Sequence, residues 1–188
     1  MMLKTAALIT LLAPLVGSLV AGLGAKRIGP KGAHAVTILG MLVALSACAW
    51  LFIHTVVYHE TFYGPIYTWA VSGRFQFDMG FMLDNLTAVV MLVVCFVSLL
   101  VHIYSIGYMR GDTGYARFFS YVSLFTFMML LLVSANNFFQ LFFGWEGVGL
   151  VSYLLIGFWF HKDSAATGSL KAFLVNRVGD FGFILGIA

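Results

Sequence analysis

The sequence contains very little charge for its length. Asp, Glu, Lys and Arg together make up only 9% of its 188 residues, whereas a soluble domain carries about 25%. Hydrophobic residues make up 62%. So few charged side chains cannot cover a surface that faces water. The composition therefore excludes a soluble globular domain and predicts an integral membrane protein.

Cysteine is almost absent as well. Cys48 and Cys95 both lie within apolar runs, which excludes the disulfide framework of a small secreted domain. No histidine or cysteine pair has metal-ligand spacing, and no haem, iron–sulfur or Ser-His-Asp pattern is present. We therefore expect no cofactor and no metal in this chain. The formal charge of +3 is too small to indicate a nucleic-acid partner, so the expected surroundings are the lipid bilayer.

Long apolar runs are what the sequence does have. A helix needs roughly 20 apolar residues to cross a bilayer, and six segments approach or exceed that length. They cover about residues 5–25, 33–57, 83–107, 118–135, 138–160 and 165–188, and the last is still apolar where the sequence ends. We therefore predict an all-α polytopic transmembrane helix bundle that forms one unit over residues 1–188, with a truncated sixth helix.

The first apolar segment has a second interpretation. Lys4, the apolar run after it and the small residues at 20–22 also resemble a secretory signal peptide. However, the run is long for a signal peptide, and a basic cluster follows it at 26–31. Such a cluster is typical of the cytoplasmic end of a membrane helix, so a transmembrane helix is the favoured interpretation.

The long loop at 58–82 contains the period of a β-strand. From Phe75 to Phe81, apolar residues alternate with small or polar ones, and a period of two is typical of a strand. Ser72-Gly73 can supply a turn that pairs this segment with residues 66–71. We therefore predict a short external β-hairpin in the loop.

The Lys and Arg residues predict the orientation, because cytoplasmic loops carry an excess of these residues. One side of the predicted bundle has only Lys4 and Arg74. The loops of the other side contain six: Lys26, Arg27, Lys31, Arg110, Arg117 and Lys162, and Lys171 lies just inside the sixth helix. We therefore expect the second side to be cytoplasmic and the N-terminus to be external.

One carboxylate interrupts a long apolar stretch. Glu146 is the single charged residue between Arg117 and His161. It follows Asn136-Asn137, a predicted turn in which either residue can cap the next helix, by about 13–14 Å of helix, which places it near the bilayer midplane. A charge there costs about 2.5–3.5 kcal/mol. Glu146 is either a buried acid bonded to a neighbouring helix or a site that loads and releases a proton, and the second interpretation is favoured because intramembrane carboxylates are functional by default.

Three glycines surround this carboxylate: Gly144, Gly147 and Gly149. Small residues let helices approach closely in a membrane. They do not form a nucleotide-binding fingerprint, because no strand precedes them and the order of glycines differs. We therefore expect them to serve helix packing.

A second group of charges lies in the sixth segment. Arg177 and Asp180 are three residues apart, so they share a helix face and can pair. They form either a structural ion pair or part of a polar axis that tunes other charges. Lys171 lies nearer the cytoplasmic end, where it either extends its amine to the surface or serves a proton entrance. His102, in the third segment, either relays protons or bonds to a backbone carbonyl.

Three stretches of the chain resemble one known family. They are VHIYSIGYMRGDTGYARFF (101–119), GWEGVGLVSYLLIGFW (144–159) and KAFLVNRVGDFGF (171–183). They resemble the L subunit of bacterial respiratory complex I, which is the distal antiporter-like membrane subunit of NADH-quinone oxidoreductase. Its mitochondrial counterpart is subunit 5. The resemblance covers nearly the whole chain, including the expected hairpin.

The resemblance implies proton translocation driven by quinone reduction elsewhere in the complex. Glu146 matches the family's fifth-helix glutamate, which pairs with a lysine on the seventh helix, and Arg177 and Asp180 match charged residues of the sixth helix. The implied partners are other membrane-arm subunits, especially the neighbouring antiporter-like subunit. NADH, FMN, iron–sulfur clusters and quinone would belong to other subunits. The implied location is the bacterial cytoplasmic (inner) membrane, with a periplasmic N-terminus.

Family members are several times longer than this chain, so we expect an N-terminal fragment that ends before the seventh-helix lysine. Two other functions stay open. The large subunit of multisubunit cation/proton antiporters is similar across these helices and couples ion exchange instead of redox chemistry. In the other interpretation, the chain by itself is an inactive truncated product. Agreement over two long motifs, SIGYMRGDTGYARFF and NRVGDFGF, favours the complex I family.

Overall fold

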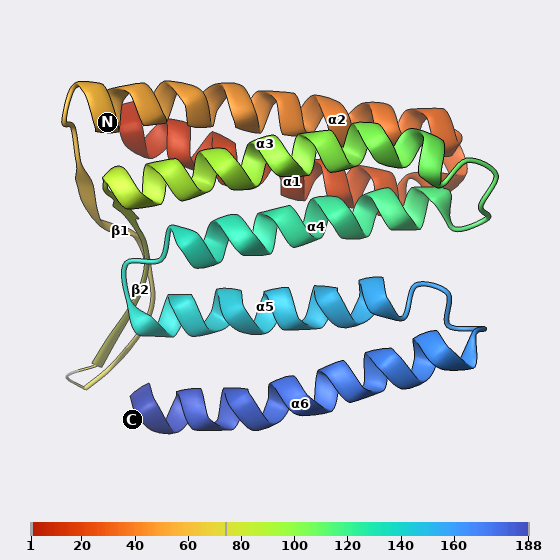
Figure 1. Cartoon of the computed structure of the whole chain (residues 1–188). Coiled ribbons are helices and arrows are strands. Elements are labelled where there is room, and N and C mark those ends of the chain that lie inside the picture. The colour runs from red at the N-terminus through yellow and green to blue at the C-terminus, as the bar shows by residue number, and fades with distance from the viewer. Residues whose placement is uncertain (1, 74, 188) are drawn as a thin grey trace.

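The computed structural model describes residues 2–73 and 75–187. Within these ranges the chain forms six α-helices and one two-stranded antiparallel hairpin (Figure 1). The predicted fold class, a helical membrane protein with a hairpin, is therefore confirmed. The helices are α1 (Met2–Leu23), α2 (Ala25–Phe52), α3 (Asn85–Tyr108), α4 (Tyr115–Val133), α5 (Phe138–Ile156) and α6 (Asp163–Ile187), and a π-helix (Ile53–Val57) extends α2.

Five of the described helices are long and apolar enough to cross a membrane: α1, α2 with its π-helical extension, α3, α4 and α5. The sixth, α6, has 25 residues, which is sufficient in length. It differs from the others in carrying Lys171, Arg177 and Asp180 along its middle. Those charges need partners in a membrane, so the position of α6 beside α5 matters for the site.

The start of α2 differs from the sequence prediction. Residues 25–33 were expected to form a loop, but helix already begins at Ala25 and contains the basic cluster. A break occurs at Gly29, whose φ of 63° and ψ of −177° lie outside the helical region. The following Pro30 disfavours helical geometry in the residue before it, and glycine tolerates a positive φ. The basic residues are therefore held on a kinked helical turn.

The helices pack as a bundle of four with two more beside it. α1 packs against α2 and α4, α2 packs against α3, and the row continues from α4 to α5 and from α5 to α6 (Figure 1). The core of the four-helix part contains Ala7, Met41, Met91 and both cysteines, all fully buried. α5 and α6 bury few side chains of their own. The site residues on these two helices are therefore less enclosed than the core.

The β-hairpin is hydrogen-bonded to the residues at the turn between α4 and α5. Its strands are β1 (Phe62–Ser72) and β2 (Phe75–Leu83), and Gly73 in the turn has a φ of 60°. The Gly80 amide donates to Gln140 Oε1 at 2.9 Å, and Asn137 Nδ2 donates to the Asp78 carbonyl at 2.8 Å. Asn137 is also the cap of α5, because its Oδ1 accepts from the Gln140 amide. The hairpin therefore fixes the first turn of α5.

The connections that carry most of the basic residues share one end of the bundle. The α1–α2, α3–α4 and α5–α6 connections lie together there, whereas the hairpin, the N-terminus and the α4–α5 turn lie at the opposite end (Figure 1). This grouping is the one on which the orientation prediction depends. Arg74, one of the two basic residues assigned to the other side, lies outside the described residues. Which end faces the cytoplasm stays a prediction.

Candidate functional site

α5 places Glu146 near its middle. The helix runs over Phe138–Ile156, and Asn137 caps its first turn. The Glu146 side chain is 25% exposed, so it is neither fully enclosed nor open. It projects towards α6, where it meets a cation. The carboxylate that stood alone in the sequence therefore has a partner in the fold.

That partner is Arg177 of α6. Arg177 Nη1 donates a hydrogen bond to Glu146 Oε2. On its own helix, Arg177 Nε lies 3.2 Å from Asp180 Oδ2, an ion pair whose angles do not make a hydrogen bond. One guanidinium therefore joins two carboxylates, one from each helix. The Arg177–Asp180 pair predicted from the spacing is present, and the bond from Arg177 to Glu146 is additional.

Asp180 has a further donor that the sequence analysis missed. Trp145 Nε1 donates to Asp180 Oδ1 at 2.9 Å, and the Asp180 side chain is only 6% exposed. The indole also contacts the Phe183 ring at a centroid distance of 6.1 Å. Trp145 and Asp180 are 35 residues apart, so no local spacing links them. The adjacency of Trp145 to Glu146 was the only available signal.

An aromatic ring and a glycine shape the space around the guanidinium. Arg177 Cζ lies 4.8 Å from the centroid of the Phe173 ring, an arrangement typical of a cation–π contact. A Cβ at Gly149 would lie 3.6 Å from Arg177 Nη2, so the small residue leaves room for the cation against α5. We refer to Glu146, Arg177, Asp180 and Trp145 together as the α5–α6 charge cluster.

The other glycines of this stretch serve helix packing, as predicted. A Cβ at Gly144 would lie 2.7 Å from Leu132 Cα and 2.8 Å from the Leu132 nitrogen, both backbone atoms of α4. At Gly147 the nearest atom would be the sulfur of Met128. Because backbone cannot yield as a flexible side chain can, Gly144 sets the closest approach of α4 and α5.

The cluster contains two carboxylates and one guanidinium. With all three ionised, the negative charge exceeds the positive charge by one, and binding of one proton would balance them. Arginine stays protonated throughout the accessible pH range, so any proton exchanged belongs to a carboxylate. The arrangement is therefore chemically suited to hold one exchangeable proton near the middle of α5.

The remaining predicted site residues lie apart from this cluster. His102 is fully buried on α3, where its Nδ1 lies 2.7 Å from the carbonyl of Ser98 and its ring contacts Phe119. Its Nε2 has no partner among the described residues. Lys171 is exposed on α6 and forms no ion pair with any described residue. The structure brings Glu146, Arg177 and Asp180 together and leaves His102 and Lys171 outside.

Among residues 2–73 and 75–187, no three His, Cys, Asp or Glu side chains gather as a metal ion would require.

A separate polar contact joins two connections at the basic end. Asp112 Oδ2 accepts from Trp159 Nε1 at 2.9 Å, and Asp112 Oδ1 accepts from the Gly114 amide at 2.6 Å. These hydrogen bonds, and then the charges of Arg117 and His161, lower the pKa of Asp112 below its ordinary value of 3.8. The α3–α4 and α5–α6 connections are therefore linked.

Two family descriptions match the sequence. Residues 69–119 match "NADH-Ubiquinone oxidoreductase (complex I), chain 5 N-terminus". Residues 135–188, which include the α5–α6 charge cluster, match "NADH:quinone oxidoreductase/Mrp antiporter, TM". The second description spans two kinds of membrane protein, a quinone oxidoreductase and an antiporter.

The chain is also similar to individual proteins. It is 59% identical over 184 residues to an NADH-quinone oxidoreductase subunit L of Neisseria meningitidis serogroup B, a match that covers 96% of this chain and 27% of that protein. It is 47% identical over 180 residues to NADH-ubiquinone oxidoreductase chain 5 of Metridium senile, with coverage of 96% and 30%. The chain therefore spans less than a third of the length of these relatives.

A solved structure shares the fold. It is a chain of the membrane-bound sulfane sulfur reductase, an archaeal respiratory membrane complex, with a TM-score of 0.84 and 18% identity. The match covers 98% of this chain and 36% of that one. At this level of identity the likeness bears on the arrangement of the helices and the hairpin alone.

Proposed function

Because this chain belongs to the NADH-quinone oxidoreductase subunit L family, we propose that it takes part in moving protons across a membrane. The observation that carries the proposal is the α5–α6 charge cluster. Glu146 lies near the middle of a helix long and apolar enough to span a bilayer, and Arg177 bonds to it. An ionisable side chain inside a membrane destabilises insertion, so such residues are by default functional, and a proton site is one such function.

The proposed mechanism is a change of partners around Glu146. While Arg177 Nη1 bonds to it, the carboxylate is stabilised in its charged form. If the guanidinium turned towards Asp180, which its Nε already approaches at 3.2 Å, Glu146 would lose that stabilisation and take up a proton. Trp145 holds Asp180 in place as the alternative partner. The proton would then pass to the next polar group across the membrane.

The energy would come from elsewhere. In this proposal the chain is one membrane subunit of an NADH:quinone oxidoreductase, beside a neighbouring antiporter-like subunit, and quinone reduction in other subunits drives the movement. The subunit would lie in a bacterial cytoplasmic membrane, with the connections rich in Lys and Arg facing the cytoplasm. His102 and Lys171 are secondary candidates, since neither contacts the cluster.

The test is a Glu146→Gln substitution in the assembled complex, with the ratio of protons moved to electrons transferred measured in closed membrane vesicles. Gln keeps the shape of the side chain and cannot exchange a proton, so we expect a lower ratio with quinone reduction retained. Glu60→Gln is the matched control, because Glu60 is 53% exposed outside the helices. A complex that assembles fully and keeps the parental ratio with Glu146→Gln contradicts the proposal.

A cation/proton antiporter subunit is the second candidate, favoured by the family description that covers residues 135–188. The two functions differ in their driving force. Vesicles containing the protein would acidify on addition of NADH under the first proposal. Under the second, a sodium or potassium gradient alone would move protons, and NADH would have no effect.

A further inference from the structure

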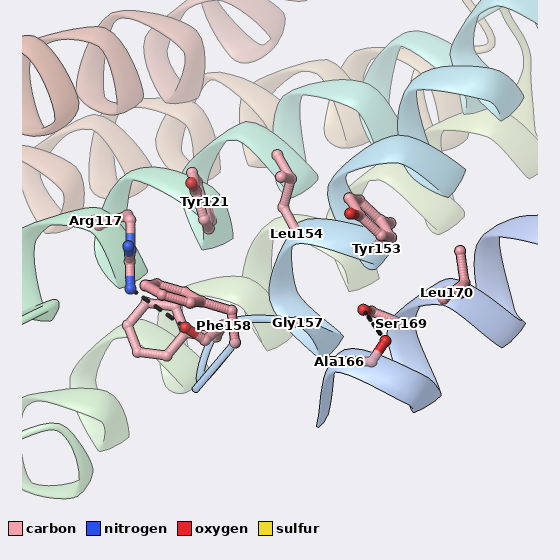
Figure 2. A pocket seen from close by; sticks show the side chains of 10 residues that line it. Arg117, Tyr121, Tyr153, Leu154, Gly157, Phe158, Ala166, Ser169 and Leu170 are labelled. Atoms are coloured by element: carbon pink, nitrogen blue, oxygen red, sulfur yellow. Dashed lines mark hydrogen bonds between the residues drawn. The ribbon is translucent and has the colours of Figure 1, made fainter. Parts of the chain in front are cut away.

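A cleft separate from the charge cluster opens among α4, α5 and α6. Its volume is about 280 Å³, and Figure 2 shows Arg117 and Tyr121 from α4, Tyr153 from α5, and Ser169 and Leu170 from α6 around it. The volume falls just under the range of roughly 300–1,000 Å³ typical of small-molecule sites. It therefore suits a compact polar group better than a whole cofactor.

The cleft lies where the helices leave the apolar part of a bilayer. Arg117 is in the first turn of α4, and Gly157 follows the last residue of α5. This is also the end at which the basic connections gather (Figure 1). A group bound here would lie at the depth of lipid head groups, whichever side of the membrane this end faces.

Arg117 has hydrogen-bond donors to spare. Its Nη2 donates to the Phe158 carbonyl at 3.2 Å, and its guanidinium lies 4.8 Å from the centroid of the Phe158 ring. Among the described residues, no carboxylate lies within ion-pairing distance of it. The nearby Asp112 already accepts bonds from Trp159 and Gly114. The guanidinium is therefore oriented by protein contacts without being neutralised by an ion pair.

Two phenols add donors to the same cleft. The hydroxyls of Tyr121 and Tyr153 form no hydrogen bond with any described residue. Leu154 and Leu170 supply apolar walls beside them. A cation, two free O–H donors and an adjacent apolar wall form the combination that a phosphate joined to an acyl chain would satisfy.

We propose that this cleft binds the phosphate of an anionic membrane phospholipid. Arg117 pairs with the phosphate oxygens, Tyr121 and Tyr153 donate hydrogen bonds to them, and the acyl chains continue along Leu154 and Leu170. Arginine suits this task because its planar fork matches two phosphate oxygens at once. A lipid bound there would contact both α6, which has the fewest buried side chains of the described α-helices, and α4. The inference does not depend on proton movement.

The experiment uses the protein purified in mild detergent from its native membrane, with its natural partners. A photoactivatable phosphatidylglycerol probe is added, and labelled peptides are identified by mass spectrometry. We expect labelling at residues 117–121 and 153–170. Arg117→Gln should lower it about tenfold, since a hydrogen bond to a charged group contributes an affinity factor of that order. Arg110→Gln, an exposed arginine at the same end outside the cleft, should leave it unchanged.

Two further arms separate the possible outcomes. Tyr121→Phe with Tyr153→Phe removes only two hydroxyls and should lower labelling, which covers the case in which Arg117→Gln misfolds. Equal labelling by a phosphatidylcholine probe, or parental labelling in all cleft variants, overturns the proposal. So does complete displacement of the probe by inorganic phosphate, which would assign the cleft to the free anion.

Discussion

The guanidinium of Arg177 bonds to the carboxylate of Glu146 across 31 positions of sequence. The two residues come from adjacent helices, α6 and α5, and both side chains are partly exposed, at 35% and 25%. Such partial exposure leaves the guanidinium room to change partners, as the proposed mechanism requires. Asp180, which accepts a hydrogen bond from Trp145, is the second carboxylate paired with the same guanidinium.

We predict that Arg177 and Glu146 are energetically coupled. Arg177→Met removes the cation and should lower the free energy of unfolding by about 1.5–3 kcal/mol, because it leaves Glu146 without its charged hydrogen-bond donor and Asp180 without its ion-pair partner. Adding Glu146→Gln should restore part of the loss. Thermal unfolding in detergent of both single variants and the double variant measures the coupling.

The matched control for this cycle is the exposed pair His54 and Glu60, whose atoms lie 3.3 Å apart. Exposed pairs contribute about 0–1 kcal/mol, so its cycle should give little coupling. Additive effects at Arg177 and Glu146 would mean that the pair does not stabilise the folded protein.

Trp145→Phe should destabilise the protein by about 1–3 kcal/mol, the cost of leaving the buried Asp180 oxygen without its donor. The substitution retains an aromatic ring against Phe183, so packing changes little. Trp69→Phe is the control, because the Trp69 ring contacts Phe139 and Phe143 and its indole N–H makes no hydrogen bond with any described residue. Equal losses in the two variants would indicate an effect of ring size alone.

The two glycines that face α4 should respond differently to alanine. Gly144→Ala forces a Cβ against the backbone of Leu132 and should cost about 1–3 kcal/mol. Gly147→Ala meets the flexible end of Met128 and should cost less. At Gly179 a Cβ meets nothing within 4 Å, so Gly179→Ala should be neutral or stabilising by up to about 1 kcal/mol. Thermal unfolding ranks the three, and a Gly144→Ala protein as stable as the parent would contradict the close approach.

The Asp112 contact should depend on pH in one direction. The folded-state pKa of Asp112 is lowered from 3.8, so its stabilising effect is complete above pH 3.8 and is lost as the pH falls through the lower folded pKa. The charges of Arg117 and His161 act on it in the same sense.

The readout is the indole N–H signal of Trp159 in a chain labelled with ¹⁵N-tryptophan, identified through Trp159→Phe. We expect that signal to shift with a midpoint below pH 3.8 and to be displaced at all pH values by Asp112→Ala. A transition centred above 3.8 would contradict the lowered pKa.

The residue pattern predicted much of this fold because the bilayer restricts it. Continuous runs of about 20 apolar residues span a bilayer as helices, and the alternation from Phe75 to Phe81 is typical of a strand. The kinked start of α2 was not predicted, because a basic cluster between two apolar runs is typical of a loop. A helix also tolerates basic residues in its terminal turns. The kink itself has a local cause, which is the Gly29-Pro30 pair.

The sequence alone determined that the protein belongs in a membrane, that it is helical with one hairpin, and that Glu146, Arg177 and Asp180 are its unusual charges. It could not determine which cation meets Glu146. The helical period shows on which side of its helix a residue lies, but it does not show which other helix packs against that side. Only the packing of α6 against α5 placed Arg177 between two carboxylates and Trp145 against Asp180. Packing likewise left Arg117 and two tyrosines around one cleft, because that depends on how three separate helix ends meet.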